Sequence, residues 1–337
     1  MKRFLIGFTV TIVTLFLIIG CEKNTSSALS DEQLEISGIE DMVLDENNEY
    51  LIDWGIDDGD ENNMFDGFST FASAFSLPKV MTPLNNVVRF GRKIDKRFPR
   101  TIVVRRISPD SILVAVERVL SGKFVIFDKI TNSSTNTDTI GITRKPLRHI
   151  VKRKTIFVKR NVTDAEFRFP RKRFRLAQVS LTLGKSKPVN TIRLEKISIK
   201  SASGYDTTFT DPLNTMLNIP EDLPTFIKGE KVTITVLVSN SSTNLLPDST
   251  GATETLLLHF GINRQHHARK RFEFKGVDPE TGFNIYEGTW TVHEPAYHLF
   301  HAVVDAIDNG TIYDTDNETY PYNSTTWGYP YRVVLAK

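Results

Sequence analysis

The feature that most constrains the fold is an alternation of apolar and polar side chains, which dominates the chain after residue 100. Apolar residues stand at every second position in segments such as 232–238 and 256–260. A period of two places successive side chains on opposite faces of a strand and does not suit a helix. Polar segments and turns rich in Gly or Pro separate these runs, so the pattern predicts a mainly β chain.

The C-terminal part, residues 204–337, has the pattern of a β-sandwich. The predicted strands lie near 232–238, 256–260, 272–274, 285–292, 297–307 and 331–335. Short strands with frequent turn signals are typical of two packed antiparallel sheets. The pattern resembles the immunoglobulin-like and fibronectin type III-like domains of bacterial surface proteins. Cys21 is the sole cysteine, so the disulfide of antibody domains is absent.

The middle part, residues 64–203, predicts helices followed by an antiparallel sheet. Helical spacing links Phe68, Phe71, Ala72 and Phe75, and then Val80, Leu84, Val87 and Val88, with Gly91 as the helix end. Strands follow near 102–116, 123–127, 148–160, 173–183 and 190–200, with a loop at 131–139 and a bulge or turn at Ser121-Gly122. The segments 90–94, 112–127 and 174–183 resemble parts of the cystatin-like or nuclear-transport-factor-like roll. The expected fold is therefore mainly β with a minor α+β part: a roll-like domain followed by an immunoglobulin-like sandwich.

The N-terminus has the order of a secretory signal. Lys2 and Arg3 precede an uncharged apolar run over 4–20, which is short for a membrane-spanning helix and ends at Cys21. The segment 17–21 resembles the lipobox of bacterial lipoproteins. That resemblance implies cleavage before Cys21 and acylation of the cysteine by diacylglycerol and, usually, a further acyl chain such as palmitate. The expected location is the cell envelope, attached to the membrane through Cys21.

The resemblance also bears on sorting and organisation. Glu22 does not match the Asp that retains enteric lipoproteins on the inner membrane, which favours the outer membrane in a bacterium with two membranes. The expected parts are a signal peptide (1–20), an acidic flexible tether (21–63), a basic α+β domain (64–203) and the sandwich (204–337). An acylated Cys21 is not available as a nucleophile or metal ligand, and no multi-cysteine metal site exists.

Charge is strongly segregated along the chain. Residues 31–66 contain 14 acidic side chains and no Lys or Arg, whereas residues 79–200 contain 30 basic and 8 acidic side chains. The 201–337 region has 9 basic and 17 acidic residues. An acidic segment of this kind repels itself and is expected to be extended. It is also a candidate to fold over the basic domain and mask it.

The basic clusters are the clearest candidate binding residues: Lys152, Arg153, Lys154, Arg171, Lys172, Arg173 and Arg175. Export makes nucleic acid an unsuitable partner, so we expect an anionic glycan, a lipid head group or another envelope protein. A solvated face that only keeps the protein soluble is the alternative interpretation.

A second candidate site is a group of acids that suits calcium, namely Asp305, Asp308, Asp314 and Asp316, with Glu318 nearby. Their spacing is not that of an EF-hand. No other cofactor is indicated. Solvated loop acids are the alternative interpretation.

No catalytic motif is complete. His293 and His298 are one residue too far apart for the zinc-protease motif, and Pro295 opposes a helix there. We therefore expect a non-enzymatic binding or assembly module. One alternative is an envelope glycan hydrolase with an unidentified carboxylate pair. The other is a structural docking module with an exposed aromatic patch at Trp327, Tyr329 and Tyr331, although packing of these three in the last strand is the interpretation we prefer.

Overall fold

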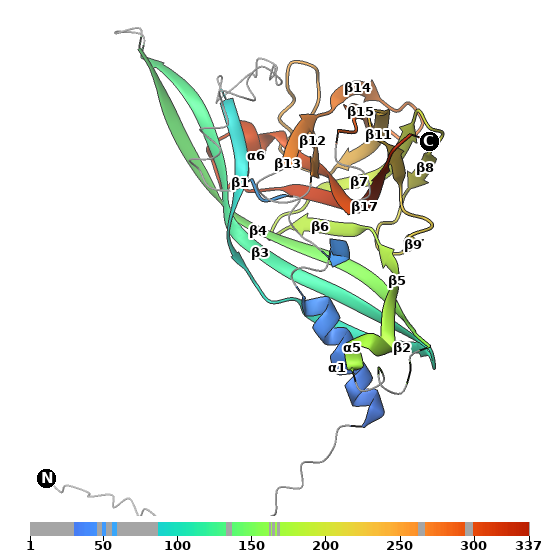
Figure 1. Cartoon of the computed structure of the whole chain (residues 1–337). Helices are drawn as coiled ribbons and strands as arrows, with labels where there is room; N and C mark the ends of the chain where they lie inside the picture. The colour runs from blue at the N-terminus through green and yellow to red at the C-terminus, as the bar shows by residue number, and fades with distance from the viewer. Residues whose placement is uncertain are drawn as a thin grey trace, which may run out of the picture.

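The computed structural model describes residues 30–45, 49–51, 56–58, 87–132, 137–161, 163, 166, 169–261, 267–293 and 299–336. The predicted signal peptide, Cys21 and the predicted helical residues 64–86 lie outside the described residues. The described part is mainly β, with two sheets and a few short helices (Figure 1), which confirms the expected fold class.

The elements follow one another along the chain with these bounds. The helical ones are α1 (Asp31–Leu44), the 3-10 helix η1 (Glu49–Leu51), α5 (Pro170–Arg173) and α6 (Asn309–Tyr313). The strands up to residue 201 are β1 (Val87–Arg97), β2 (Thr101–Ser108), β3 (Ser111–Asn132), β4 (Thr137–Lys159), β5 (Phe174–Ser180), β6 (Thr182–Ser186) and β7 (Ile192–Ser201). The later strands are β8 (Asp206–Phe209), β9 (Met216–Asn218), β10 (Thr225–Ile227), β11 (Lys231–Asn240), β12 (Glu254–Gly261), β13 (His267–Arg271), β14 (Glu273–Val277), β15 (Asn284–Thr291), β16 (Leu299–Asp308) and β17 (Ser324–Val334).

The two sheets form a sandwich. The 12-stranded sheet runs in the order β1-β3-β4-β6-β17-β16-β12-β13, with β2, β5, β9 and β10 paired to its members, and the five-stranded sheet runs β14-β15-β11-β7-β8. Side chains of both sheets meet in one apolar core, for example Ile234, Trp290 and Val304. Trp327, Tyr329 and Tyr331 are buried in this core. The preferred interpretation of these three residues is confirmed, and the exposed aromatic patch is wrong.

The sheets cross the predicted domain boundary at residues 203 and 204. β7 precedes that boundary and lies between β11 and β8 of the smaller sheet, and β6 pairs with β17 of the larger one. The four-part domain division stays a prediction, but the strands on the two sides of residue 203 share their hydrogen-bond ladders.

A long hairpin, β3 with β4, dominates the larger sheet (Figure 1). The strands pair without interruption from Ser111 opposite Val158 to Asn132 opposite Thr137, so the predicted loop at 131–139 is shorter than expected. Residues directly opposite each other in an antiparallel pair point to the same face. We call the face that carries Ile112, Phe124 and Leu147 the inner face, and the opposite one the outer face.

The expected helix end at 87–94 is wrong, because this segment is strand β1. It pairs with β3, and Phe90 and Ile94 enter an inner-face core with Phe124. The helical spacing of Val87 and Val88 was misleading because apolar neighbours in short runs suit either structure, and pairing with β3 decided between them. The segment 90–94 is therefore not the helix end on which the resemblance to the cystatin-like or nuclear-transport-factor-like roll partly depended.

The predicted bulge at Ser121-Gly122 lies in the partner strand. β3 is continuous there, and the register of β1 shifts between Ile94 and Lys96, opposite these two residues. A Cβ on Gly122 would lie 1.9 Å from the Lys93 carbonyl oxygen, so only glycine allows this close approach. Asp308 is the N-cap of α6.

The start of the acidic segment is helical and not extended. Ser30 and Gln33 form a capping box at the N-terminus of α1, and the buried Ile39 and Val43 enter an apolar core with Phe157. Local self-repulsion is offset by this burial and by arginines that face the helix, which the next section describes. Residues 31–44 are therefore an integral layer over the inner face.

Candidate anionic-ligand surface and buried polar cluster

The outer face of β1, β3, β4 and β6 is basic. The register places Lys93 opposite Lys123, Arg148 opposite Ser121, and Lys185 opposite Ile150, all on this face. Its basic side chains, each exposed or half-buried, are Arg89, Lys93, Lys96, Lys123, Lys129, Arg144, Arg148, Lys152, Lys154 and Lys185. Most of these cations stand on alternate positions of neighbouring strands and form one surface rather than a sequence cluster. Val125 and Phe127, on the same face towards the hairpin tip, are buried.

Two acidic side chains are described on this face. Among the described side chains of this face, Glu117 is acidic and lies 2.8 Å from the Lys152 ammonium, and Asp95 stands at the bulge of β1. Lys154 donates a hydrogen bond of 2.7 Å to the side chain of Asn214. An exposed ion pair such as Lys152 with Glu117 contributes at most about 1 kcal/mol to stability. The surface is therefore a concentration of positive charge.

The predicted basic residues do not form a single site. Lys152 and Lys154 lie on the outer face, but Arg153 between them is buried on the inner face and donates to Thr182 Oγ1 at 2.9 Å. Arg175 is exposed and lies opposite Val158, on the outer face at the far end of the hairpin. The remaining three, around α5, face the acidic segment or their own loop.

The ion pairs of α5 and the adjoining strands involve α1. Arg173 is buried 3.4 Å from Asp31, and Arg171 lies 3.5 Å from Asp41. Lys172 is paired with Glu166, 3.8 Å away. The predicted cluster at 171–173 is thus occupied by the protein's own carboxylates.

Glu35 is the central carboxylate of α1. It is buried and lies 2.8 Å from the guanidinium of Arg106 and 3.4 Å from the ammonium of Lys159. Arg100 donates to the carbonyls of Val43 at 2.8 Å and Leu51 at 2.7 Å, which fixes the end of α1 and η1. Two cations on a buried carboxylate compensate for the cost of desolvating it.

Further along the acidic segment, residues 56–58 continue on the inner face. Asp57 is ion-paired with Arg97. Asp58 accepts from the Arg92 backbone N–H at 2.7 Å and lies 3.3 Å from the Arg269 guanidinium. The described part of the acidic segment therefore covers inner-face arginines, and the contacts it makes are not with the outer-face lysines. The expectation that the segment folds over the basic region is confirmed for the inner face.

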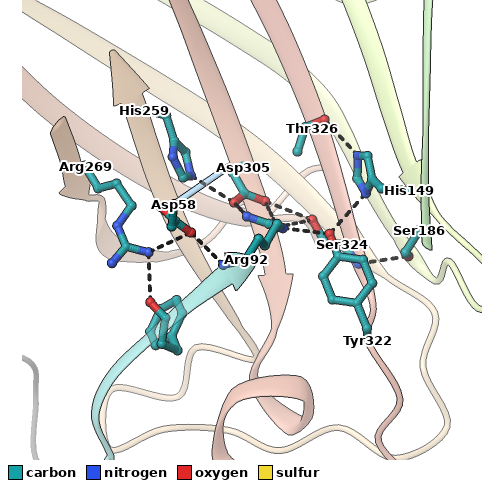
Figure 2. Close-up of polar contacts among 11 residues, drawn as sticks. Asp58, Arg92, His149, Ser186, His259, Arg269, Asp305, Tyr322, Ser324 and Thr326 are labelled. Carbon is teal, nitrogen blue, oxygen red and sulfur yellow. Dashed lines mark hydrogen bonds and ion pairs between the residues drawn. The ribbon is translucent and has the colours of Figure 1, made fainter. Parts of the chain in front are cut away.

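A buried polar cluster joins β1 to the sandwich strands (Figure 2). Arg92 on β1 is paired with Asp305 on β16 through two parallel hydrogen bonds of 2.5 and 2.8 Å. Arg92 also donates to Tyr322 at 2.7 Å and to Ser324 at 2.9 Å. Both charged groups are at most 1% exposed. Burial alone would lower the pKa of Arg92 and raise that of Asp305, but their mutual attraction reverses both shifts, so both stay charged.

Two buried histidines complete the cluster. His259 Nε2 lies 3.0 Å from Asp305 Oδ2, and His149 Nε2 lies 3.2 Å from Thr326 Oγ1. Burial, and then the charge of Arg92, lowers the pKa of His149 to about 3. Burial likewise lowers the pKa of His259 in spite of Asp305. His149 is therefore neutral at pH 7, and its Nδ1 is hydrogen-bonded to the Tyr322 hydroxyl at 3.1 Å.

Gly184 on β6 makes room for this cluster. A Cβ at this position would lie 2.3 Å from His149 Nε2 and 2.1 Å from Thr326 Oγ1. The cluster holds β1, β4, β12, β16 and β17 in one arrangement. An Asp–His pair can serve a catalytic nucleophile, but His149, His259 and Asp305 are at most 1% exposed, so a substrate cannot reach them.

The acids predicted to bind calcium are not brought together. Asp305 is in the buried cluster, and Asp308 caps α6 by accepting from the Gly310 N–H at 2.8 Å. Asp314 and Asp316 each accept an N–H two residues later in an exposed loop. Among the described residues, no group of three or more His, Cys, Asp or Glu side chains is arranged to hold a metal ion.

The side chain of Lys145 is a buried cation near this loop. Its buried ammonium donates to the Gly310 carbonyl at 3.0 Å and to the Tyr320 carbonyl. Burial lowers the pKa of Lys145 to about 8, and the carboxylates of Asp314, Asp308 and Asp316 oppose that shift. The ammonium of Lys145 therefore lies near Asp308, Asp314 and Asp316, whereas Asp305 is paired with Arg92 in the buried cluster.

A pocket of about 340 Å³ next to β12 and β15 is lined by three carboxylates, Asp248, Glu254 and Glu273. Glu254 accepts from Asn284 and Tyr286, each at 2.9 Å. Asp248 accepts the backbone N–H of Thr250 at 2.8 Å and is paired with Arg271 at 3.3 Å. Glu273 is paired with Lys275, so all three carboxylates hold local structure. Of the two histidines that the sequence analysis rejected as a zinc motif, His293 is exposed, and His298 lies outside the described residues.

Comparison with known families and with curated proteins finds no match for this chain. In the described part of the chain, no helix has the length and apolar character needed to cross a membrane.

Sequence reasoning missed the outer face, Arg92 and His149. The outer face had a readable signal, because Arg148, Lys152 and Lys154 stand an even number of residues apart in the predicted strand at 148–160. The pairing of Arg92 with Asp305 had no such signal. The two residues lie on β1 and β16, which are far apart in the sequence and do not pair with each other in the sheet.

Proposed function

We propose that this protein is a lipid-anchored, non-enzymatic binding module of the bacterial cell envelope, and that its outer basic face binds a polyanionic envelope ligand. The observation that supports the ligand class is the set of cations on β1, β3, β4 and β6, with Glu117 and Asp95 as the described acids nearby. The acidic segment supports the assignment indirectly, because its described carboxylates are used by inner-face arginines.

The expected binding is electrostatic and therefore sensitive to salt. A Lys or Arg close to an anionic surface contributes about 1 kcal/mol. Several such groups on one face give useful affinity, although each contact is weak. The Debye length falls to about 3 Å at 1 M ionic strength, so bound protein should be released by salt.

The test is heparin binding by the full chain in a nonionic detergent. Charge reversal at Lys123, Arg148 and Lys185 together should lower the salt concentration that elutes the protein and weaken binding at low salt by at least about tenfold. The matched control reverses three exposed lysines elsewhere, Lys228, Lys231 and Lys270, and has the same net charge. An equal loss in both triple variants would show that total charge, and not the outer face, determines binding.

The anchor is proposed from the lipobox-like segment that ends at Cys21. We expect the mature protein to begin at Cys21 and to carry acyl chains, which mass spectrometry of its N-terminal peptide would measure. Cys21→Ser should abolish the acyl mass and leave an unprocessed precursor. A mature N-terminus elsewhere, or processing that is insensitive to globomycin, would refute the anchor.

We also propose that the C-terminal half is related to immunoglobulin-like domains. It is supported by the packing of β11 and β15 against β12 and β16 around one aromatic-rich core. An experimental structure with a different strand connectivity would overturn it. The location in the outer membrane is likewise proposed, from Glu22 alone, and fractionation of the two membranes would test it.

A further inference from the structure

The pocket next to β12 and β15 lies at the edge of the sandwich core. The chain passes from the larger sheet to the smaller one at Phe272, whose backbone N–H donates to the Leu256 carbonyl at 2.9 Å. Leu256, Phe272 and Tyr286 belong to the apolar core and also line the pocket. Thr250 and Glu273 line it as well and are exposed, so the pocket is open to solvent. Its volume of about 340 Å³ is at the lower end of the range of about 300–1,000 Å³ that is typical of small-molecule sites.

One donor of a lining residue has no acceptor. Arg271 donates from Nη2 to Asp248 at 3.3 Å and to Thr255 Oγ1 at 3.4 Å, and both contacts are longer than the usual range of about 2.7–3.2 Å. Its Nη1 is buried and has no hydrogen-bond partner among the described residues. Buried donors in native proteins are nearly always paired, so Nη1 indicates an acceptor that comes from a ligand.

The charge of the pocket limits the class of that ligand. The lining residues include one base, Arg271, and three acids, which disfavours an anion. Asp248 and Glu254 already accept hydroxyl groups of the chain, at 2.6 and 2.9 Å. An ammonium ion has no acceptor to offer Arg271, whereas a hydroxyl group both donates and accepts. The pocket therefore suits a neutral ligand that carries hydroxyl groups.

We propose that this pocket binds a neutral sugar residue. A sugar hydroxyl accepts from Arg271 Nη1, and the C–H groups of the sugar ring pack on the apolar side chains of Leu256, Phe272 and Phe274. A sugar combines the hydroxyl groups and the apolar ring face that this lining requires. The inference is independent of the proposed anionic ligand, because the pocket lies among β12–β15 and the outer basic face lies on β1, β3, β4 and β6.

The test is an array of immobilised glycans, neutral and sulfated, which is probed with the full chain in a polyoxyethylene detergent that carries no sugar. The wild-type protein should bind a subset of the neutral glycans, and the terminal monosaccharide of a bound glycan should compete with it in solution. Absence of binding to every neutral glycan would overturn the proposal, whether or not the sulfated glycans are bound.

Two substitutions test whether the neutral glycans bind in the pocket. Arg271→Met removes the unpaired donor and keeps a long side chain, whereas Thr250→Trp obstructs the pocket and leaves Arg271 in place. Each should weaken binding to the neutral glycans by about tenfold or more. The matched control is Lys270→Met, which removes one positive charge from an exposed side chain next to Arg271 and should bind these glycans like the wild type.

The sulfated glycans separate this inference from the proposed function. Charge reversal at Lys123, Arg148 and Lys185 should abolish binding to the sulfated glycans and keep binding to the neutral ones, and the two pocket variants should do the opposite. Far-ultraviolet circular dichroism checks that each variant is folded, and if Arg271→Met is not, Thr250→Trp decides. Neutral-glycan binding that survives in the folded pocket variants, or that is lost in the charge-reversal variant, would contradict the inference.

Discussion

At the scale of single residues, Arg92 and Asp305 show how this fold tolerates charge in its interior. Each of them desolvated alone would cost several kcal/mol, and the two-bond pairing with further donors from Ser324 and His259 offsets that cost. Buried pairs of this kind add little net stability, but they penalise every arrangement in which the partners are apart. The cluster therefore specifies which strands become neighbours.

The histidines of this cluster predict how stability depends on pH. The pKa of His149 is about 3 in the folded protein and about 6.5 in the unfolded chain, so the unfolded chain binds the extra proton between these values. The free energy of unfolding should then fall as the pH drops from 6.5 towards 3, by about 1.4 kcal/mol per pH unit for this residue. His149→Gln cannot titrate and should flatten the slope.

Urea unfolding at pH 7, 5 and 4 measures this slope. The control is His293→Gln, at an exposed position, which should keep the wild-type slope. Identical slopes for wild type and His149→Gln would mean that His149 is not held neutral by burial.

At the scale of elements, α1 is a structural layer that carries charge. Ile39 and Val43 are completely buried against the inner face, while Asp31 and Asp41 pair with α5 arginines at its rim. Deleting residues 31–66 would therefore expose an apolar core as well as uncover arginines. A change in ligand binding after such a deletion would not by itself report unmasking.

Point substitutions in α1 separate the contribution of its apolar side chains to stability from the contribution of its ion pairs. Ile39→Ser should lower the free energy of unfolding by about 2–4 kcal/mol, because it leaves a cavity and buries a hydroxyl. Glu32→Gln removes a 66% exposed partner of Arg106 and should cost no more than about 1 kcal/mol. Chemical unfolding measures both. If the two variants were equally stable, α1 would be an electrostatic cover and not part of the core.

At the scale of the whole molecule, strands from the basic and acidic halves of the chain share both sheets. β7 is flanked by β11 and β8, and β6 connects β4 to β17. We therefore expect unfolding to be a single cooperative transition, with tryptophan fluorescence from Trp290 and Trp327 in the sandwich coinciding with far-ultraviolet circular dichroism. An early loss of secondary structure that leaves the tryptophan signal intact would show that the hairpin unfolds as a separate unit.

The alternation of residues in β11, β12 and β15 was enough to predict the mainly β class and the sandwich, because a period of two is a local property of each strand. Segregation of charge was equally readable and led to the expected contact between the acidic segment and basic residues. The candidate site was predicted only in part. Of the predicted basic residues, Lys152 and Lys154 lie on the outer face, but Arg153 and Arg173 face inward. A run of basic residues in the sequence does not reveal which face of the sheet each side chain occupies.

The sequence by itself determined the strand character, the sandwich and the charge of each segment, since these follow from neighbours along the chain. The tertiary structure alone decided three things: that 87–97 is a strand, that 31–44 is a helix over a core, and that lysines from four strands form one face. Each depends on partners tens of residues to more than a hundred residues away, whose pairing is set by the sheet and cannot be read from local periodicity.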